Sequence, residues 1–443
     1  MALSAETRNE LKTLYNALSD RVLTPDDPVY VPEINAVGQS GADPVIEIAT
    51  EIDWQEGGGV CLFTGQRGTG KSTELRRLQV ELESIGVVAF YADLSEYILL
   101  TKPIEISDFL ISMAGALSDR VAADPRFAGN PSRRSYWERL AHFLDTKVEF
   151  KDVSLKVPQV GDIKASLKND PDFKQRIQQV SRGHVAQIVQ DAHAFFRETV
   201  QELRLTTGNP DLKVALLLDS IERIRGVGDE AMGVYESVRN LFFAHAEHLR
   251  IPFLHLVYTV PPYLSILAAG AGSLMGGAVV RRLVSTHIFQ DRSREVDPVG
   301  LELLRKVIAR RHIGWYRVFS DEALDRLALS SGGDLREFFR LVRLCLPAVR
   351  DESALPLSRD AVAHVEKSAR AEMLPIPADQ LDWLQRIARS NNTCLQKDDD
   401  LPLLAHFLDN RLVLNYRNVS DWYDVHPLLR EVVDDHVPTG SHT

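Results

Sequence analysis

The residues best suited to chemistry in this sequence are glycines, a lysine and hydroxyl residues at a fixed spacing. Residues 65–73 read Gly-Gln-Arg-Gly-Thr-Gly-Lys-Ser-Thr, which matches the phosphate-binding pattern G-x-x-x-x-G-K-[ST]. In such a loop successive backbone N–H groups point into one concavity, and the start of the following helix adds positive potential. The residues predicted to surround a nucleotide phosphate are Gly65, Gly68, Thr69, Gly70, Lys71, Ser72 and Thr73.

The surroundings of this loop favour the functional interpretation over a chance match in a glycine-rich turn. Residues 59–64 form a short apolar run typical of a strand, and residues 72–83 have the apolar spacing of an amphipathic helix. Strand, tight loop and helix start are the context that the motif needs. Lys71 is predicted to reach the β- and γ-phosphates, and the Ser72 hydroxyl to bind magnesium.

A second candidate stretch ends in a carboxylate. Residues 214–218 are uninterruptedly apolar, as in a strand buried on both faces, and Asp219 follows directly. Downstream of a phosphate loop, Asp219 is predicted to bind magnesium through water, although a buried strand can also end in Asp as a turn residue. Glu222 is the nearest following carboxylate. It either orients the attacking water, caps the next turn, or pairs with Arg223 or Arg225.

Two further polar residues follow predicted elements. Residues 251–258 read as another buried strand, so Thr259 at its end can sense the γ-phosphate or simply terminate the strand. Later, residues 332–336 read Gly-Gly-Asp-Leu-Arg. The glycines should end one helix and Asp334 should cap the next. Arg336 would then project from the first turn and could reach back to the phosphates.

Composition sets the broad class. The chain has 443 residues, enough for two or three domains, and a net charge of −11 argues against chain-wide, non-specific affinity for nucleic acid or acidic membranes. The three cysteines, Cys61, Cys345 and Cys394, share no metal-ligand spacing, which fits a reducing cytosol. No signal peptide and no membrane span are expected, so a cytoplasmic location is predicted.

The order of these motifs resembles that of AAA+ ATPases. The similarity is greatest to the initiator-type (origin-recognition-like) proteins and to the related STAND signalling ATPases. This resemblance implies an α/β fold: a P-loop NTPase (AAA+/ASCE) core with a parallel sheet, a helical lid and a C-terminal winged helix. It assigns Lys71 and Ser72 to Walker A, Asp219 to Walker B, Thr259 to sensor 1 and Arg336 to sensor 2.

The resemblance also implies which cofactors are bound and how fast ATP is hydrolysed. ATP or ADP with Mg²⁺ would be bound, with Ser72 and Asp219 as the metal residues and Lys71, Asp219, Glu222, Thr259 and Arg336 as the catalytic ones. Ser220, rather than a Glu, follows Asp219, as in the NACHT branch of STAND proteins, so slow hydrolysis is expected.

The predicted domain ranges cover the whole chain. They are a helix and extended arm at 1–41, the core at 42–295 with an insertion at 124–205, the lid at 296–374, the winged helix at 375–437 and a loose tail at 438–443. Residues 124–168 look irregular and basic, and the alternation at 148–157 suggests a hairpin or exposed strand. The insertion either packs on the core or binds a partner. Residues 30–32 are a candidate cover for the adenine.

Basic residues around the predicted last strand, residues 283–289, have two interpretations. Arg281, Arg282, Arg292 and Arg294 could act as arginine fingers on a neighbouring subunit's nucleotide, or they are solvated surface residues. In the C-terminal region, His426 either contacts ADP, as a histidine does in STAND proteins, or is structural.

Charge in the C-terminal region bears on DNA. Residues 379–435 contain eleven Asp and Glu against six Lys and Arg. Because phosphate contacts dominate affinity for DNA, this balance favours a protein-contact or autoinhibitory role, with DNA binding kept as the alternative.

The sequence therefore predicts an ATP-binding and ATP-hydrolysing regulatory switch. It would control its own oligomerisation or a separately encoded partner protein, in bacterial signalling or defence, with no membrane contact. The alternative is a DNA-binding initiator or loader ATPase. A nucleotide-binding scaffold with negligible turnover is the third possibility.

Overall fold

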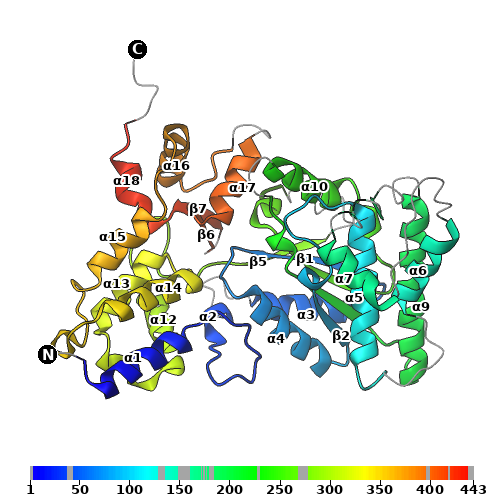
Figure 1. The fold of residues 1–443 in the computed structure, drawn as a ribbon, viewed down its shortest axis with the longest axis horizontal. Coiled ribbons are helices and arrows are strands. Elements are labelled where there is room, and N and C mark those ends of the chain that lie inside the picture. Colours follow the sequence, from blue (N-terminus) through cyan, green and yellow to red (C-terminus); the bar gives the residue numbers. More distant parts are fainter. Residues whose placement is uncertain are drawn as a thin grey trace, which may run out of the picture. The chain divides into compact units, whose positions relative to one another are not determined.

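A computed structural model describes residues 3–36, 43–127, 135–147, 160–226, 230–267, 278–395, 400–417 and 420–437, except 171, 173, 174, 176 and 179–183 (Figure 1). The chain forms two compact units. The first comprises residues 1–44, 65–74 and 282–443, and the second comprises residues 45–64 and 75–281.

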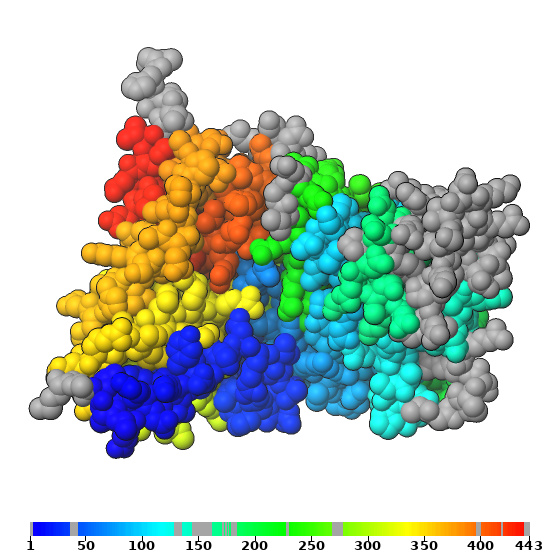
Figure 2. All heavy atoms as spheres, in the orientation of Figure 1, coloured from blue at the N-terminus to red at the C-terminus, as the bar shows by residue number. Residues whose placement is uncertain are grey.

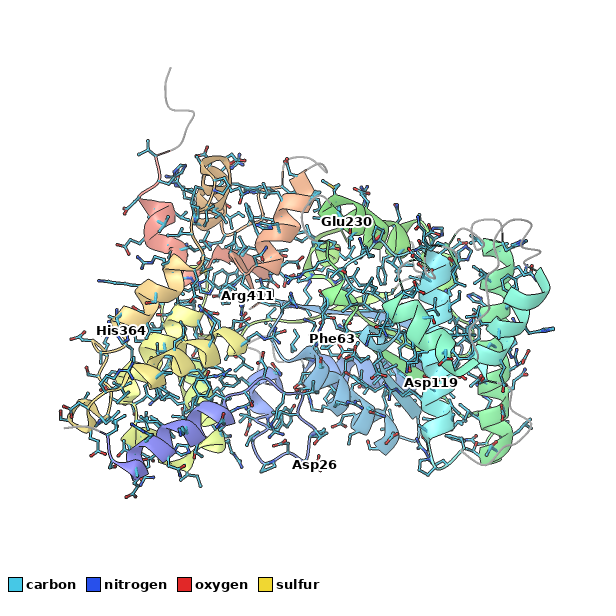
Figure 3. All side chains as sticks on the ribbon, in the orientation of Figure 1. Asp26, Phe63, Asp119, Glu230, His364 and Arg411 are labelled. Atoms are coloured by element: carbon cyan, nitrogen blue, oxygen red, sulfur yellow. The ribbon has the colours of Figure 1, made fainter. Side chains whose placement is uncertain are left out.

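A five-stranded sheet has the strand order β2-β3-β4-β1-β5. Its strands are β1 (Val60–Gly65), β2 (Val88–Asp93), β3 (Val214–Asp219), β4 (His255–Val260) and β5 (Val279–Leu283). The pairings β2–β3, β3–β4 and β4–β1 are parallel. The side chains of β1 to β4 are almost all buried, including Phe63 of β1 (Figure 3). Burial on both faces explains why these strands appear in the sequence as apolar runs.

The predicted α/β fold with a parallel sheet is confirmed. The strand β4 lies between β1, which leads into the phosphate loop, and β3. The predicted last strand was misplaced: β5 covers residues 279–283, not 283–289. β5 is an edge strand whose side chains are only partly buried, so it can contain Arg281 and Arg282.

Helices alternate with these strands. They are α3 (Pro44–Trp54), α4 (Lys71–Ser84), α5 (Ile106–Ala123), α6 (Tyr136–Lys147), α7 (Val160–Asn169), α9 (Val185–Thr207) and α10 (Ala231–Phe243). In Figure 1, α5 lies against β2, with α6 and α9 beside it. None of the helices in the described ranges is long and apolar enough to span a membrane.

The expectation of irregular structure at 124–168 was wrong where it can be examined, because α6 and α7 are regular helices. Tyr136 and Trp137 are buried in α6, and the Trp137 indole N–H donates to Asp119 Oδ1 of α5 (2.8 Å). These aromatic anchors fix α6 on α5. The predicted strand at 148–157 lies outside the described residues.

The first unit has a helical core to which both chain ends contribute. Its helices are α1 (Ala5–Ala17), α2 (Glu33–Ala36), α12 (Pro298–Arg311), α13 (Asp321–Ser331), α14 (Leu335–Cys345) and α15 (Ala363–Ala371). Leu14 of α1 is fully buried in the same core as Leu304 of α12 and Phe338 of α14. Figure 2 shows the N-terminal atoms, in blue, lying against the yellow atoms of these helices.

The C-terminal segment consists of α16 (Ala378–Ser390), α17 (Leu401–Asp409), β6 (Val413–Arg417), β7 (Asp421–Val425) and α18 (Arg430–Asp434). β6 and β7 form an antiparallel hairpin in which the rings of Tyr416 and Trp422 stack at 4.4 Å. Two helices thus precede the hairpin in this segment. Its assignment as a winged helix stays a prediction.

Candidate nucleotide-binding site

The phosphate loop of the first unit runs from Gly65, the last residue of β1, to Lys71, the first residue of α4. Gly68 has a φ of 99°, which favours glycine. A Cβ at Gly68 would lie 2.7 Å from the Cβ of Arg336 and 3.0 Å from Oδ1 of Asp334. The loop is therefore in direct contact with the first turn of α14, and only glycine permits this approach.

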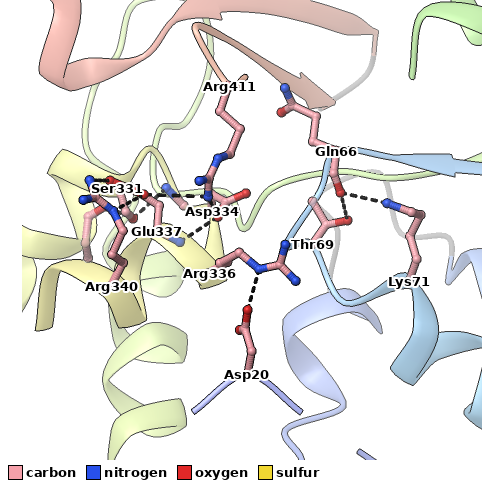
Figure 4. A network of polar contacts seen from close by, with 12 residues as sticks. Asp20, Gln66, Thr69, Lys71, Ser331, Asp334, Arg336, Glu337, Arg340 and Arg411 are labelled. Carbon is pink, nitrogen blue, oxygen red and sulfur yellow. Dashed lines mark hydrogen bonds and ion pairs between the residues drawn. The ribbon is translucent and has the colours of Figure 1, made fainter. Parts of the chain in front are cut away.

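The Lys71 ammonium lies within the loop (Figure 4). Its Nζ donates to the backbone carbonyls of Gly65 (2.7 Å) and Gln66 (2.9 Å), and the side chain is almost fully buried. The Thr69 hydroxyl donates to the same Gln66 carbonyl (2.9 Å). The positive charge of Lys71 therefore lies among the backbone groups that would surround a phosphate.

The Gly-Gly-Asp-Leu-Arg turn joins α13 to α14 as predicted. Gly332 ends α13 with a φ of 65°, and the Asp334 carboxylate accepts a hydrogen bond from the Glu337 N–H (2.8 Å), so Asp334 caps α14. Burial raises the pKa of Asp334, although the nearby Arg411 guanidinium opposes this shift. Arg336 extends from the first turn of α14, and its Nε pairs with Asp20 Oδ2 at 2.7 Å.

Charged side chains surround this turn. Glu337 pairs with Arg340 (2.6 Å), and Arg411, in the turn before β6, lies 3.3 Å from Asp334 and 3.7 Å from Glu337 (Figures 3 and 4). Burial alone would raise the pKa of Glu337, but the hydrogen bond from Arg340 and the neighbouring positive charges outweigh it, and its pKa is lowered. The turn is thus held to the C-terminal segment by partly buried ion pairs.

The N-terminal arm contacts the beginning of α4. The Leu23 N–H donates to the Thr73 hydroxyl (3.1 Å), while the Tyr30 hydroxyl and the Asn35 amide both donate to Oε1 of Glu74 (2.8 and 2.9 Å). These contacts hold residues 23–35 beside the phosphate loop. An adenine-covering role for residues 30–32 stays a prediction, and so does a nucleotide contact of Thr73.

In the second unit, Asp219 ends β3 and is fully buried. Its Oδ2 accepts a hydrogen bond from the Tyr91 hydroxyl (2.6 Å), and its Oδ1 accepts one from the Ser220 N–H (2.7 Å). Burial and the Asp219 charge raise the pKa of Tyr91, so Tyr91 remains a donor. Tyr91 lies on β2 and orients the carboxylate, a role that the sequence did not indicate because no motif marks it.

Thr259 and Glu222 lie near the same end of β3. Ser220 adopts a left-handed φ of 70°, and the next N–H, that of Ile221, donates to the Thr259 hydroxyl (3.2 Å). Thr259 thus contacts the turn after Asp219, and its hydroxyl hydrogen can still be donated. Glu222 is nearly buried and lies 3.9 Å from Arg223. Its role in orienting water stays a prediction.

Three of the four arginines considered as arginine fingers have carboxylate partners within their own unit: Arg281, Arg282 and Arg294. Arg281 pairs with Glu47 and Glu51, Arg282 pairs with Asp421, and Arg294 pairs with Asp424. Arg292 is exposed.

His426 lies within the C-terminal segment, and an ADP contact of this residue stays a prediction. It is fully buried, and its Nδ1 accepts a hydrogen bond from the Leu428 N–H (3.3 Å) at the start of a short 3-10 helix. Burial lowers the pKa of His426 to about 4, so the ring is neutral at pH 7.

The donor set fits magnesium. Ser72 and Asp219 offer a hydroxyl and a carboxylate, the oxygen ligands that Mg²⁺ takes. Within the described part of the chain, no three His, Cys, Asp or Glu residues are grouped to hold a metal by themselves.

No protein-family model matches the chain, and no curated protein matches its sequence. Several solved structures are similar to it. The ORC2 protein of Aeropyrum pernix in its ADPNP-ADP complexes is 12% identical with a TM-score of 0.40, over 95% of this chain and 96% of that one. The Aeropyrum pernix ORC1 protein in complex with DNA is 14% identical with a TM-score of 0.36, over 95% and 96%.

Drosophila ORC bound to poly(dA/dT) DNA and Cdc6 contains a chain that is 10% identical with a TM-score of 0.34, over 93% of this chain and 53% of that one. These identities and TM-scores are too low to assign a role to any residue of this chain.

Proposed function

We propose that this protein is an ATP-binding and slowly ATP-hydrolysing switch of the AAA+ type. The observation that supports this best is the contact of Gly68 in the phosphate loop with Asp334 and Arg336 in the first turn of α14. A polyphosphate bound by the loop would lie next to a guanidinium on a separate helix. The presence or absence of the γ-phosphate would then change how that helix is held.

Each site residue has a proposed task. Lys71 binds the β- and γ-phosphates, Arg336 contacts them from α14, and Thr259 donates its hydroxyl to the γ-phosphate. Ser72 and Asp219 hold Mg²⁺, which when bound neutralises phosphate charge. Glu222 orients the attacking water.

The switch would operate through differential affinity. A ligand shifts a conformational equilibrium only by the difference in its affinity for the two states. ATP and ADP differ by the γ-phosphate that Lys71, Thr259 and Arg336 contact. We propose that this difference controls oligomerisation or a separately encoded partner protein in the cytoplasm.

Phosphate release under saturating MgATP tests the activity. The wild-type protein should turn over slowly, because Ser220 occupies the place of the usual Glu after Asp219. Lys71→Ala should reduce the rate to background, and Glu222→Gln should reduce it while leaving ATP binding intact. Equal rates for wild type and Lys71→Ala would remove hydrolysis at this site and leave at most a nucleotide-binding scaffold.

A DNA-binding initiator or loader is the second candidate. The motif order of the sequence resembles that of initiator-type proteins, and the similar structures include proteins solved with DNA. Against a duplex-reading role for α17, its sequence contains neither Lys nor Arg. Binding of duplex DNA at increasing salt separates the two: tight binding that falls steeply with salt supports the initiator, and its absence with and without MgATP supports the switch.

A further inference from the structure

Gln66, the second residue of the phosphate loop, joins the loop to β6. Its side chain is 2% exposed. Nε2 donates to the Val413 carbonyl (2.6 Å), and Oε1 accepts a hydrogen bond from the Asn415 N–H (3.1 Å). These two backbone groups are two residues apart, so they point to the same edge of the strand. The Gln66 amide therefore pairs with β6 as a residue of an adjacent strand would.

This edge of β6 is the one that does not face β7. Leu412, directly before Val413, turns its carbonyl the other way and accepts a hydrogen bond from the N–H of His426 after β7 (2.9 Å). Alternate residues of a strand point to opposite edges, so Val413 and Asn415 point away from the hairpin partner. Gln66 thus satisfies backbone groups on the outer edge of a two-stranded hairpin.

The backbone of Gln66 is bound to the phosphate-binding lysine. Its carbonyl accepts hydrogen bonds from Lys71 Nζ (2.9 Å) and from the Thr69 hydroxyl (2.9 Å). In a phosphate loop this lysine is the residue that reaches the β- and γ-phosphates. The side chain of Gln66 therefore holds β6, while its carbonyl holds the ammonium that phosphate would attract.

We propose that Gln66 is a positioning residue through which nucleotide binding and docking of β6 oppose each other. Phosphate draws Lys71 from the Gln66 carbonyl, the first turn of the loop shifts, and the two bonds to β6 weaken. Conversely, the bonds to β6 favour the arrangement in which Lys71 stays on the carbonyl. This inference rests on the proposed binding of ATP and adds the contact by which occupancy reaches the C-terminal segment.

Release of β6 would also affect the turn that carries Arg336. The Tyr416 hydroxyl of β6 donates to the Gly332 carbonyl (2.9 Å), and Arg411 pairs with Asp334 (3.3 Å). Both contacts join the hairpin segment to the Gly-Gly-Asp-Leu-Arg turn. The phosphate loop, this turn and β6 therefore each contact the other two. A change at Gln66 can thus affect both the loop that carries Lys71 and the turn that carries Arg336.

The test uses Gln66→Met, which keeps the length of the side chain and removes its hydrogen bonds. The matched control is Gln385→Met, because Gln385 is 4% exposed and its Nε2 donates to the Val433 and His436 carbonyls (3.1 and 3.0 Å), away from the loop. Calorimetry measures the affinity for MgATP. Amide hydrogen exchange of residues 413–417 is measured with and without MgATP.

Gln66→Met should bind MgATP about three- to tenfold more tightly than wild type, which corresponds to about one net hydrogen bond. Its β6 amides should exchange faster without nucleotide, and Gln385→Met should keep wild-type affinity. In wild type, MgATP should speed exchange of the same amides, a result that does not depend on whether any variant folds.

Two failures can be distinguished. Unchanged affinity of Gln66→Met, or β6 exchange that does not respond to MgATP in a wild type that binds it, overturns the coupling and leaves ATP binding standing. A wild type that binds no MgATP contradicts the proposed function itself.

Discussion

At the residue scale, Arg336 has a competing partner. Its Nε pairs with Asp20 at 2.7 Å, but both side chains are substantially exposed, 40% and 58%, so this pair contributes little to stability. If Arg336 contacts phosphate, Asp20 competes for the guanidinium. Asp20→Asn should therefore bind MgATP roughly two- to threefold more tightly, and Arg336→Ala about tenfold or more weakly, the range of a charge-assisted hydrogen bond.

Fluorescence titration with a labelled ATP measures both variants, and thermal unfolding confirms that each is folded. Affinities of both variants equal to that of wild type would show that Arg336 has no contact with the nucleotide.

The residues with roles fixed by a local motif could be predicted from the sequence, and those with roles fixed by distant contacts could not. The phosphate loop and the Asp334 cap depend on neighbours within a few residues. Gln66 occupies a position that the motif leaves open, and its partner Val413 is 347 residues away. Tyr91 likewise meets Asp219 across 128 residues, through the pairing of β2 with β3.

At the scale of elements, the α13–α14 turn depends on Gly333. Its φ is 79°, and a Cβ there would collide with the backbone carbonyl oxygen of Thr286, whose N–H in turn donates to the Gly333 carbonyl (3.0 Å). Gly333→Ala should lower the free energy of unfolding by several kcal/mol, since backbone must move as well as adopt a strained φ.

Gly86 provides the control, because its φ is 83° and a Cβ there would meet open space. Gly86→Ala should cost only about 1–2 kcal/mol of backbone strain in urea unfolding. Similar losses for the two variants would show that the contact with Thr286 does not constrain the turn.

Elements were predicted well where apolar spacing is regular. The strands predicted at 59–64, 214–218 and 251–258 and the helix predicted at 72–83 agree with β1, β3, β4 and α4 to within a few residues. β5 was misplaced because its arginines are unusual in a strand, although an edge strand accommodates them. α6 was missed because its many charged residues obscured the apolar pattern of Tyr136 and Trp137, which face α5. In both cases tertiary partners satisfy side chains that, in the sequence alone, argue against a regular element.

At the scale of the whole molecule, buried histidines predict sensitivity to acid. The pKa of His426 is lowered to about 4 by burial. Between its ordinary value of about 6.5 and about 4, the unfolded chain binds more protons than the folded one, so stability falls as pH falls through this window. His426 should contribute roughly 2 kcal/mol to the loss between pH 7 and pH 5.

Urea unfolding at the two pH values measures this loss. His426→Asn keeps an acceptor for the Leu428 N–H and cannot be protonated in this range, so it should lose less stability on acidification than wild type. His364→Asn, at an exposed position of α15 (Figure 3), should behave as wild type. An identical loss in His426→Asn would refute a buried neutral ring.

The central claim, a nucleotide held by the phosphate loop next to the first turn of α14, is tested most directly by titrating MgATP into the purified wild type and Lys71→Ala in a calorimeter. The account predicts saturable binding of MgATP to wild type. The affinity of Lys71→Ala should be at least tenfold lower, because the phosphate-binding ammonium is gone, while its unfolding midpoint is unchanged. The absence of heat in wild type freed of copurified nucleotide, or equal affinity in the two proteins, would contradict it.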